Sequence, residues 1–79
     1  MAGASFDIYT VYQDTLDYPG RIVVRIFQIT PRGERVAPEP LAVVMTLDEA
    51  RSAIRRAYPG AVRMHRMPGD DPVIVETWI

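Results

Sequence analysis

Residues 46–60 read TLDEARSAIRRAYPG and decide the fold, because they encode a helix with clear limits. Thr46 is a favourable N-cap, and Glu49 three residues later completes a capping box, in which each side chain can reach a backbone amide of the other residue. Two acidic residues fall in the first turn and two arginines in the last, as the helix dipole favours. Pro59-Gly60 ends the helix. The stretch predicts one amphipathic helix, from Leu47 to about Tyr58. Its apolar stripe consists of Leu47, Ala50, Ile54 and Ala57 or Tyr58.

Strand patterns flank this helix on both sides. β-branched, aromatic and alternating apolar residues predict strands over Phe6–Tyr12, Arg21–Thr30, Leu41–Met45, Ala61–Met67 (the weakest) and Val73–Ile79. Residues 31–35 are expected to form a polar turn, and the prolines within residues 36–40 exclude that stretch from the middle of a sheet. The order β-β-β-α-β-β predicts an α+β fold, an antiparallel sheet of about five strands with one α-helix packed on one face.

Composition limits the chain to one small domain. Its 79 residues leave room for a single core, and the 48% of hydrophobic residues are enough to build one. Residues 1–5 are expected to be flexible. Cysteine is absent, no apolar run is long enough for a membrane helix, and no secretory signal is present, so we expect a cytoplasmic protein of a bacterial cell that does not contact membranes.

No constellation of residues typical of catalysis is present in the sequence. The only histidine is His65, and the serines, Ser5 and Ser52, lie in no local motif for a nucleophile. The glycines stand singly beside turns rather than in a phosphate-binding loop, and the adjacent Asp70 and Asp71 lack the spaced oxygens of a calcium loop. We therefore expect neither an enzyme nor a bound metal or cofactor.

Acidic residues gather in the predicted loops. If two of these loops meet at one end of the sheet, they form a negative patch on rigid turns, which suits a basic protein groove. The alternative is that they are ordinary polar loop residues. The partner-binding candidates are Asp14, Asp17, Asp70, Asp71, Glu34 and Glu39.

The basic residues offer an alternative face. All nine are arginines, and Arg51, Arg55, Arg63 and Arg66 would converge if the helix lies beside the fourth strand. Alternatively, Arg51 and Arg55 pair with Asp48 and other acids on a solvated helix face. Because the net charge is −1, nucleic acid is an unlikely direct ligand.

Four stretches carry a resemblance to known proteins. They are Tyr9–Tyr12, Asp17–Pro19, Thr46–Arg51 and Gly69–Ile79, and together they resemble a family of small uncharacterised bacterial and prophage proteins. The chain also looks like a phage-encoded anti-CRISPR protein in its small size, its lack of enzyme motifs and its lysine-free, arginine-rich composition. The resemblance points to a type I CRISPR system as the target, with type I-C as the best match. The resemblance implies binding to a Cas subunit or to the Cascade surveillance complex, and it identifies no site residues.

The expected function is therefore that of a non-enzymatic inhibitor that binds a host protein complex and blocks its access to target DNA. Two other functions stay open. One is a small nucleic-acid-binding or regulatory module that uses the arginine face, and the other is a structural homodimer that pairs through an exposed sheet edge. We expect a monomer, for which light scattering across a range of concentrations is a simple test.

Overall fold

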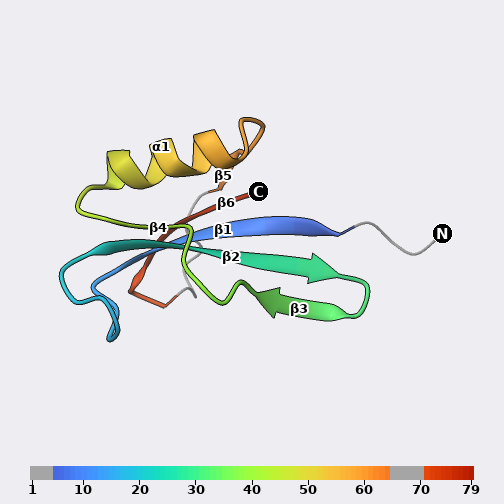
Figure 1. The fold of residues 1–79 in the computed structure, drawn as a ribbon, viewed down its shortest axis with the longest axis horizontal. Coiled ribbons are helices and arrows are strands. Elements are labelled where there is room, and N and C mark those ends of the chain that lie inside the picture. Colours follow the sequence, from blue (N-terminus) through green and yellow to red (C-terminus); the bar gives the residue numbers. More distant parts are fainter. Residues whose placement is uncertain (1–4, 65–70) are drawn as a thin grey trace.

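A long antiparallel hairpin forms the centre of the sheet. The computed structural model describes residues 5–64 and 71–79, in which β1 (Phe6–Gln13) pairs with β2 (Ile22–Thr30) along its whole length (Figure 1). Phe6 lies opposite Ile29 at one end and Gln13 lies opposite Ile22 at the other. The predicted pairing of the first two strands is confirmed. Flexibility is expected for residues 1–5. Residues 1–4 of this stretch lie outside the described part.

The second edge of β2 pairs with two short strands. They are β3 (Gly33–Val36) and β4 (Ala42–Val44), and both run antiparallel to β2. The loop between them carries the two prolines and leaves the ladder, as their missing amides require. The sequence-based expectation of a turn over residues 31–35 is wrong for its second half. The tight turn at Gly33, whose φ is +128°, folds the chain back at once, and residues 33–36 then pair with the end of β2.

The other edge of the hairpin is extended by the C-terminal strands. The strand β6 (Ile74–Trp78) pairs with β1, and the two-residue strand β5 (Arg63–Met64) pairs with β6. The sheet has six strands in the order β3-β2-β1-β6-β5, with β4 also beside β2. The predicted pairing of the C-terminal strand is confirmed. The strand expected over residues 61–67 begins at Arg63, two residues later than predicted. Residues 65–67 lie outside the described part.

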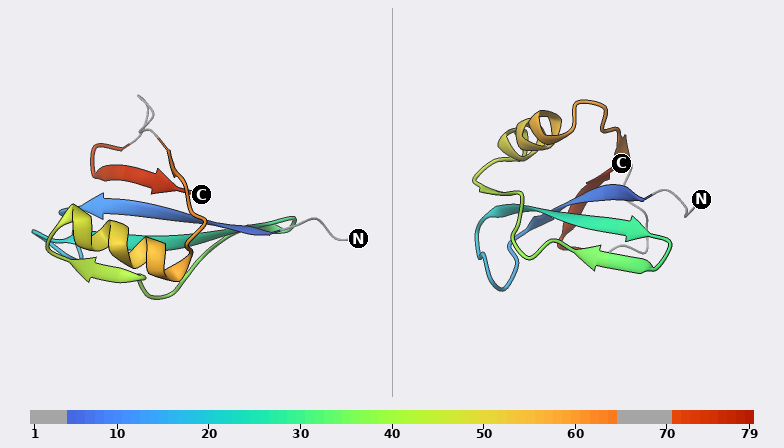
Figure 2. Two further views of the ribbon diagram at one scale, coloured as in Figure 1. Left: turned by 90° about the horizontal axis from the view of Figure 1, so that it is seen from above. Right: turned by 45° about the vertical axis from the view of Figure 1, so that its right-hand side comes forward.

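The helix α1 (Leu47–Ala57) covers one face of this sheet (Figure 2). The backbone amide of Glu49 donates to Oγ1 of Thr46 at 3.2 Å, which confirms the predicted cap. The return contact differs from the expected one, because the Thr46 hydroxyl donates to Oε1 of Glu49 at 3.0 Å. The amide of Tyr58 donates to the carbonyl of Ile54 and marks the predicted end of the helix. The α+β architecture predicted from the sequence is therefore the one observed.

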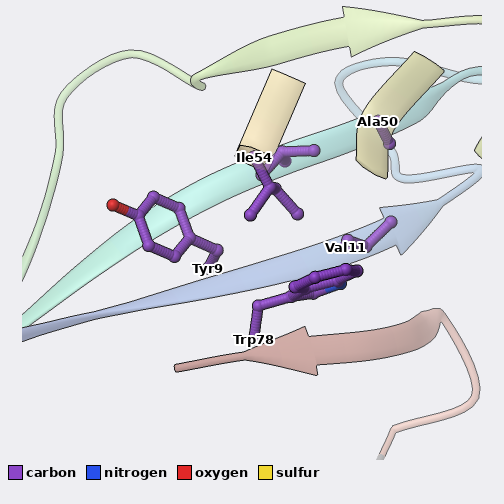
Figure 3. Packing of buried hydrophobic residues seen from close by; sticks show 6 residues of the cluster. Tyr9, Val11, Ala50, Ile54 and Trp78 are labelled. Atoms are coloured by element: carbon purple, nitrogen blue, oxygen red, sulfur yellow. The ribbon is translucent and has the colours of Figure 1, made fainter. Parts of the chain in front are cut away.

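The core lies between α1 and the strands beneath it. Figure 3 shows Ile54 and Ala50 from the helix against Tyr9, Val11 and Trp78 from β1 and β6. Among the members of the predicted stripe, Leu47 is half-buried, whereas Ala57 and Tyr58 are exposed. The fully buried part of the stripe is therefore shorter than predicted and consists of Ala50 and Ile54.

Candidate functional site

The acidic residues of the β1–β2 loop hold that loop in shape. Asp14 has a φ of +52°, a left-handed conformation that aspartate tolerates better than most residues. Its Oδ1 accepts the backbone amide of Gly20 at 2.8 Å, which closes the loop on itself. Asp14 is exposed, and this hydrogen bond gives it a structural role beside the binding role predicted from the sequence.

Asp17 ties the same loop to the sheet. Its Oδ1 accepts from the hydroxyl of Thr15 at 2.8 Å, and its Oδ2 accepts from Nη2 of Arg25 at 2.6 Å. The Thr15 hydroxyl, followed by the charge of Arg25, holds the pKa of Asp17 below its ordinary value. Because Arg25 lies in β2 with its side chain on the face away from α1, the loop folds over part of that face (Figure 1).

Two further acidic candidates, Asp71 and Glu34, carry charges that act on the phenol of Tyr12. Asp71 accepts the amide of Val73 through Oδ1 at 3.0 Å, and the carbonyl of Val73 accepts the amide of Gln13 at 2.8 Å, so this turn adjoins the end of β1. Burial raises the pKa of the Tyr12 phenol, the charge of Arg25 opposes this, and the charges of Glu34 and Asp71 raise the pKa further. The structure therefore brings Asp17 and Asp71 to the Tyr12 end of the β1–β2 hairpin, whereas Glu34 lies opposite Ile29, toward the other end of β2.

The two remaining acidic candidates are not part of this group. Glu39 is exposed in the loop between β3 and β4, at the outer edge of β2. Asp70 lies outside the described residues. The predicted meeting of acidic loops thus holds for the β1–β2 loop and the turn before β6. Glu34 lies in strand β3 rather than in the loop in which the sequence placed it, opposite Ile29 and away from these two loops.

The face of the sheet away from α1 is largely apolar, and we call it the open face. Strand registry places Tyr12, Thr10 and Ile8 on it, opposite Val23, Arg25 and Phe27 of β2. Val23 is fully buried under the β1–β2 loop, but four apolar side chains at the margins of the face are 39–51% exposed. Those four are Phe6, Val36, Val43 and Met64. No helix of the described part covers this face.

The arginines of the alternative face gather on the other side of the sheet. Arg51 and Arg55 from α1 and Arg63 from β5 line one shallow pocket with Trp78. The guanidinium carbon of Arg55 lies 5.5 Å from the centre of the Trp78 ring. The predicted convergence holds for these three arginines, and Arg66 lies outside the described residues.

Sequence reasoning missed the buried carboxylate of Glu76. It is 5% exposed and accepts from Arg51 Nη2 at 2.8 Å, from Arg51 Nε at 3.3 Å and from the indole Nε1 of Trp78. Burial alone would raise the pKa of Glu76, but the hydrogen bonds from Arg51 and Trp78 and the charges of Arg51 and Arg63 lower it overall. Arg51 thus pairs with Glu76 rather than with Asp48. The overlooked signal was the two-residue spacing of Glu76 and Trp78, which places both on the same face of the strand.

Within residues 5–64 and 71–79, no helix is long and apolar enough to span a bilayer, and no group of three acidic or histidine side chains is placed to hold a metal ion. No protein-family model, curated protein or solved structure matches this chain.

Proposed function

We propose that this protein is a non-enzymatic inhibitor that binds a host protein complex through the open face of its sheet. The observation that carries the proposal is the exposure of Phe6, Val36, Val43 and Met64 on one continuous sheet face. Together with the half-buried Ile8, Phe27 and Ile29 between them, these side chains form an apolar surface of the kind typical of protein interaction, which isolated exposed side chains do not form. A folded strand framework holds these side chains in place, which limits the entropy lost on binding.

The charges beside this face indicate the chemistry of the partner. Asp17 and Asp71 lie at the Tyr12 end of the hairpin and Glu34 lies on β3 at the other end of β2; of these three carboxylates, only Asp17 makes an ion pair within the described residues. A surface that combines apolar contacts with carboxylates suits a basic partner surface, because complementary potentials speed association and select the partner. A protein groove that normally holds nucleic acid is basic and fits this description.

The proposed target follows from the resemblance to phage-encoded anti-CRISPR proteins. It is a Cas subunit of a type I surveillance complex, with type I-C as the first to test, in the cytoplasm of a bacterial host. Binding there would block access of the complex to target DNA without any chemical step. This mechanism requires only a stable surface and a complementary groove.

A DNA-binding competition assay tests this function. The purified protein is added to a purified type I-C surveillance complex, and binding of labelled target DNA is measured by gel mobility shift. We expect DNA binding to fall as the protein is titrated. The fall should be complete at a molar ratio of protein to surveillance complex that equals the number of binding sites on the complex. If the complex binds its target equally well at saturating protein, and no association is detected by interferometry, this target is excluded.

Matched variants identify the binding face. Val36→Glu and Val43→Glu introduce a charge on the open face and should weaken inhibition by about tenfold or more, since desolvating an unpaired charge is costly. Ala57→Glu adds the same charge at an exposed residue of α1, on the other side of the sheet, and should have little effect. Glu34→Gln should slow association most strongly at low salt. If Ala57→Glu abolishes inhibition and the open-face variants do not, the open face is not the binding surface.

A further inference from the structure

The arginine pocket beside Trp78 lies on the α1 side of the sheet and is separate from the open face. It is a shallow, open hollow with a volume of about 480 Å³. Three of the six residues that line it are arginines from two elements, Arg51 and Arg55 on α1 and Arg63 on β5. Such a concentration of guanidinium groups in one hollow is unusual for a chain with net charge −1.

The charge in this pocket is only partly compensated. Glu76 neutralises Arg51 through three hydrogen-bond contacts. Neither Arg55 nor Arg63 makes an ion pair within residues 5–64 and 71–79. Within the described residues, the charges of Arg55 and Arg63 are therefore not matched by an ion pair, and the carboxylate of Glu76 is already bonded to Arg51.

Two of the three guanidinium groups are held in place before any ligand arrives. Arg51 is fixed by Glu76, and Arg55 lies over the ring of Trp78, which is itself 5% exposed. Arg63 is opposite Trp78 in the β5–β6 ladder, so its backbone position is set by strand pairing. Preorganised donors lose less entropy on binding than free surface side chains do.

We propose that this pocket binds a phosphate monoester group. A guanidinium fork matches phosphate oxygens in bidentate geometry, and the phosphate monoester carries a charge close to −2 near neutral pH. That charge matches Arg55 and Arg63 together, whereas one carboxylate would match only one of them. Because Trp78 is buried and Arg55 occupies one face of its ring, the pocket offers no platform on which a base could stack. The phosphate itself is therefore the recognised group, on inorganic phosphate or at the end of a nucleotide or oligonucleotide.

The single tryptophan provides the readout. Arg55 contacts the Trp78 ring, and the only indole N–H in the chain is bonded to Glu76, so an anion in the pocket should change the fluorescence of Trp78 and the NMR signal of its indole. Inorganic phosphate is titrated into the purified full chain at constant ionic strength. Arg55→Gln and Arg63→Gln should each weaken binding by about tenfold or more, as loss of a charged hydrogen bond implies.

The matched control is Arg56→Gln. It makes the same change at the adjacent helix residue, which lines a different hollow with Leu41 and Val44, and it should leave phosphate affinity within about twofold. Equal losses in all three variants would indicate general charge attraction and overturn the site. Absence of any saturable change with inorganic phosphate in the unmodified protein would overturn it as well.

Further titrations distinguish the source of the phosphate and the competing ligands. A nucleoside monophosphate should bind and the parent nucleoside should not, and a 5′-phosphorylated oligonucleotide should bind more tightly than the same oligonucleotide without that phosphate. Equal binding of the two oligonucleotides would instead identify a phosphodiester backbone site and overturn the proposal. Tighter binding of an acidic peptide than of any phosphate compound would identify a protein partner and also overturn it. Because the variants lie away from the open face, these outcomes do not depend on the proposed inhibition.

Discussion

Replacing Arg51 by methionine tests whether the buried carboxylate of Glu76 depends on one cation. Methionine keeps much of the apolar stem and a good helix propensity, so the change mainly removes the guanidinium group. The side chain of Glu76 is 7% exposed, and without Arg51 its described donor is the indole Nε1 of Trp78 alone. A charge held in this way is strongly destabilising, because folding must remove it from water without an adequate partner.

The size of the effect follows from the exposure of the two partners. Breaking a buried pair costs about 3–5 kcal/mol, and the 25% exposure of the Arg51 side chain admits water and places the expected cost at the lower end, about 3 kcal/mol. Glu76→Gln should cost less, about 1.5 kcal/mol, since Arg51 can turn toward solvent and the amide oxygen can still accept from Trp78. The double variant should cost only about 2 kcal/mol, because it removes the unpaired charge.

Urea unfolding followed by far-ultraviolet circular dichroism measures these free energies without relying on Trp78, whose fluorescence depends directly on the network. Arg56→Met serves as the control at an exposed position of the same helix and should stay within about 0.5 kcal/mol of the unmodified protein. The reasoning is refuted if Arg51→Met costs less than about 1 kcal/mol, or if the two single changes simply add in the double variant.

Three other perturbations have clear expected outcomes. The pKa of Glu76 is below its ordinary value of 4.5 in the folded chain, so the unfolded chain takes up the proton first as the pH falls. Stability should therefore decrease below about pH 5, and Glu76→Gln should weaken this dependence in urea titrations between pH 7 and pH 3. Thr46→Ala should cost about 1 kcal/mol by removing the acceptor for the Glu49 amide, and should lower the melting temperature by about 4–8 °C, whereas Thr46→Ser should not. Ile54→Ala should cost about 3 kcal/mol by leaving a cavity in the core, and Leu16→Ala, at a fully exposed residue, should leave the urea midpoint unchanged.

The sequence by itself determined the elements whose interactions are local. The helix begins at Thr46 because its cap bonds to an amide three residues away, and it ends near Tyr58 because proline and glycine follow. The β1–β2 hairpin follows from two strong strand patterns joined by a short loop, and the two prolines of residues 36–40 leave the ladder as their missing amides require. These outcomes depend on neighbours along the chain, which a sequence displays directly.

Only the tertiary structure decided which distant side chains meet. Strand β3 forms because the end of β2 offers unpaired backbone groups, a requirement invisible within residues 33–36 themselves. Arg51 and Glu76 are 25 residues apart, and their pairing depends on the packing of α1 over β6. Likewise, Asp17 and Asp71 come to the same end of the β1–β2 hairpin through strand pairing and loop closure rather than through spacing in the sequence. Contacts of this kind are fixed by registry and helix placement, because a shift of one residue would turn each strand side chain to the opposite face.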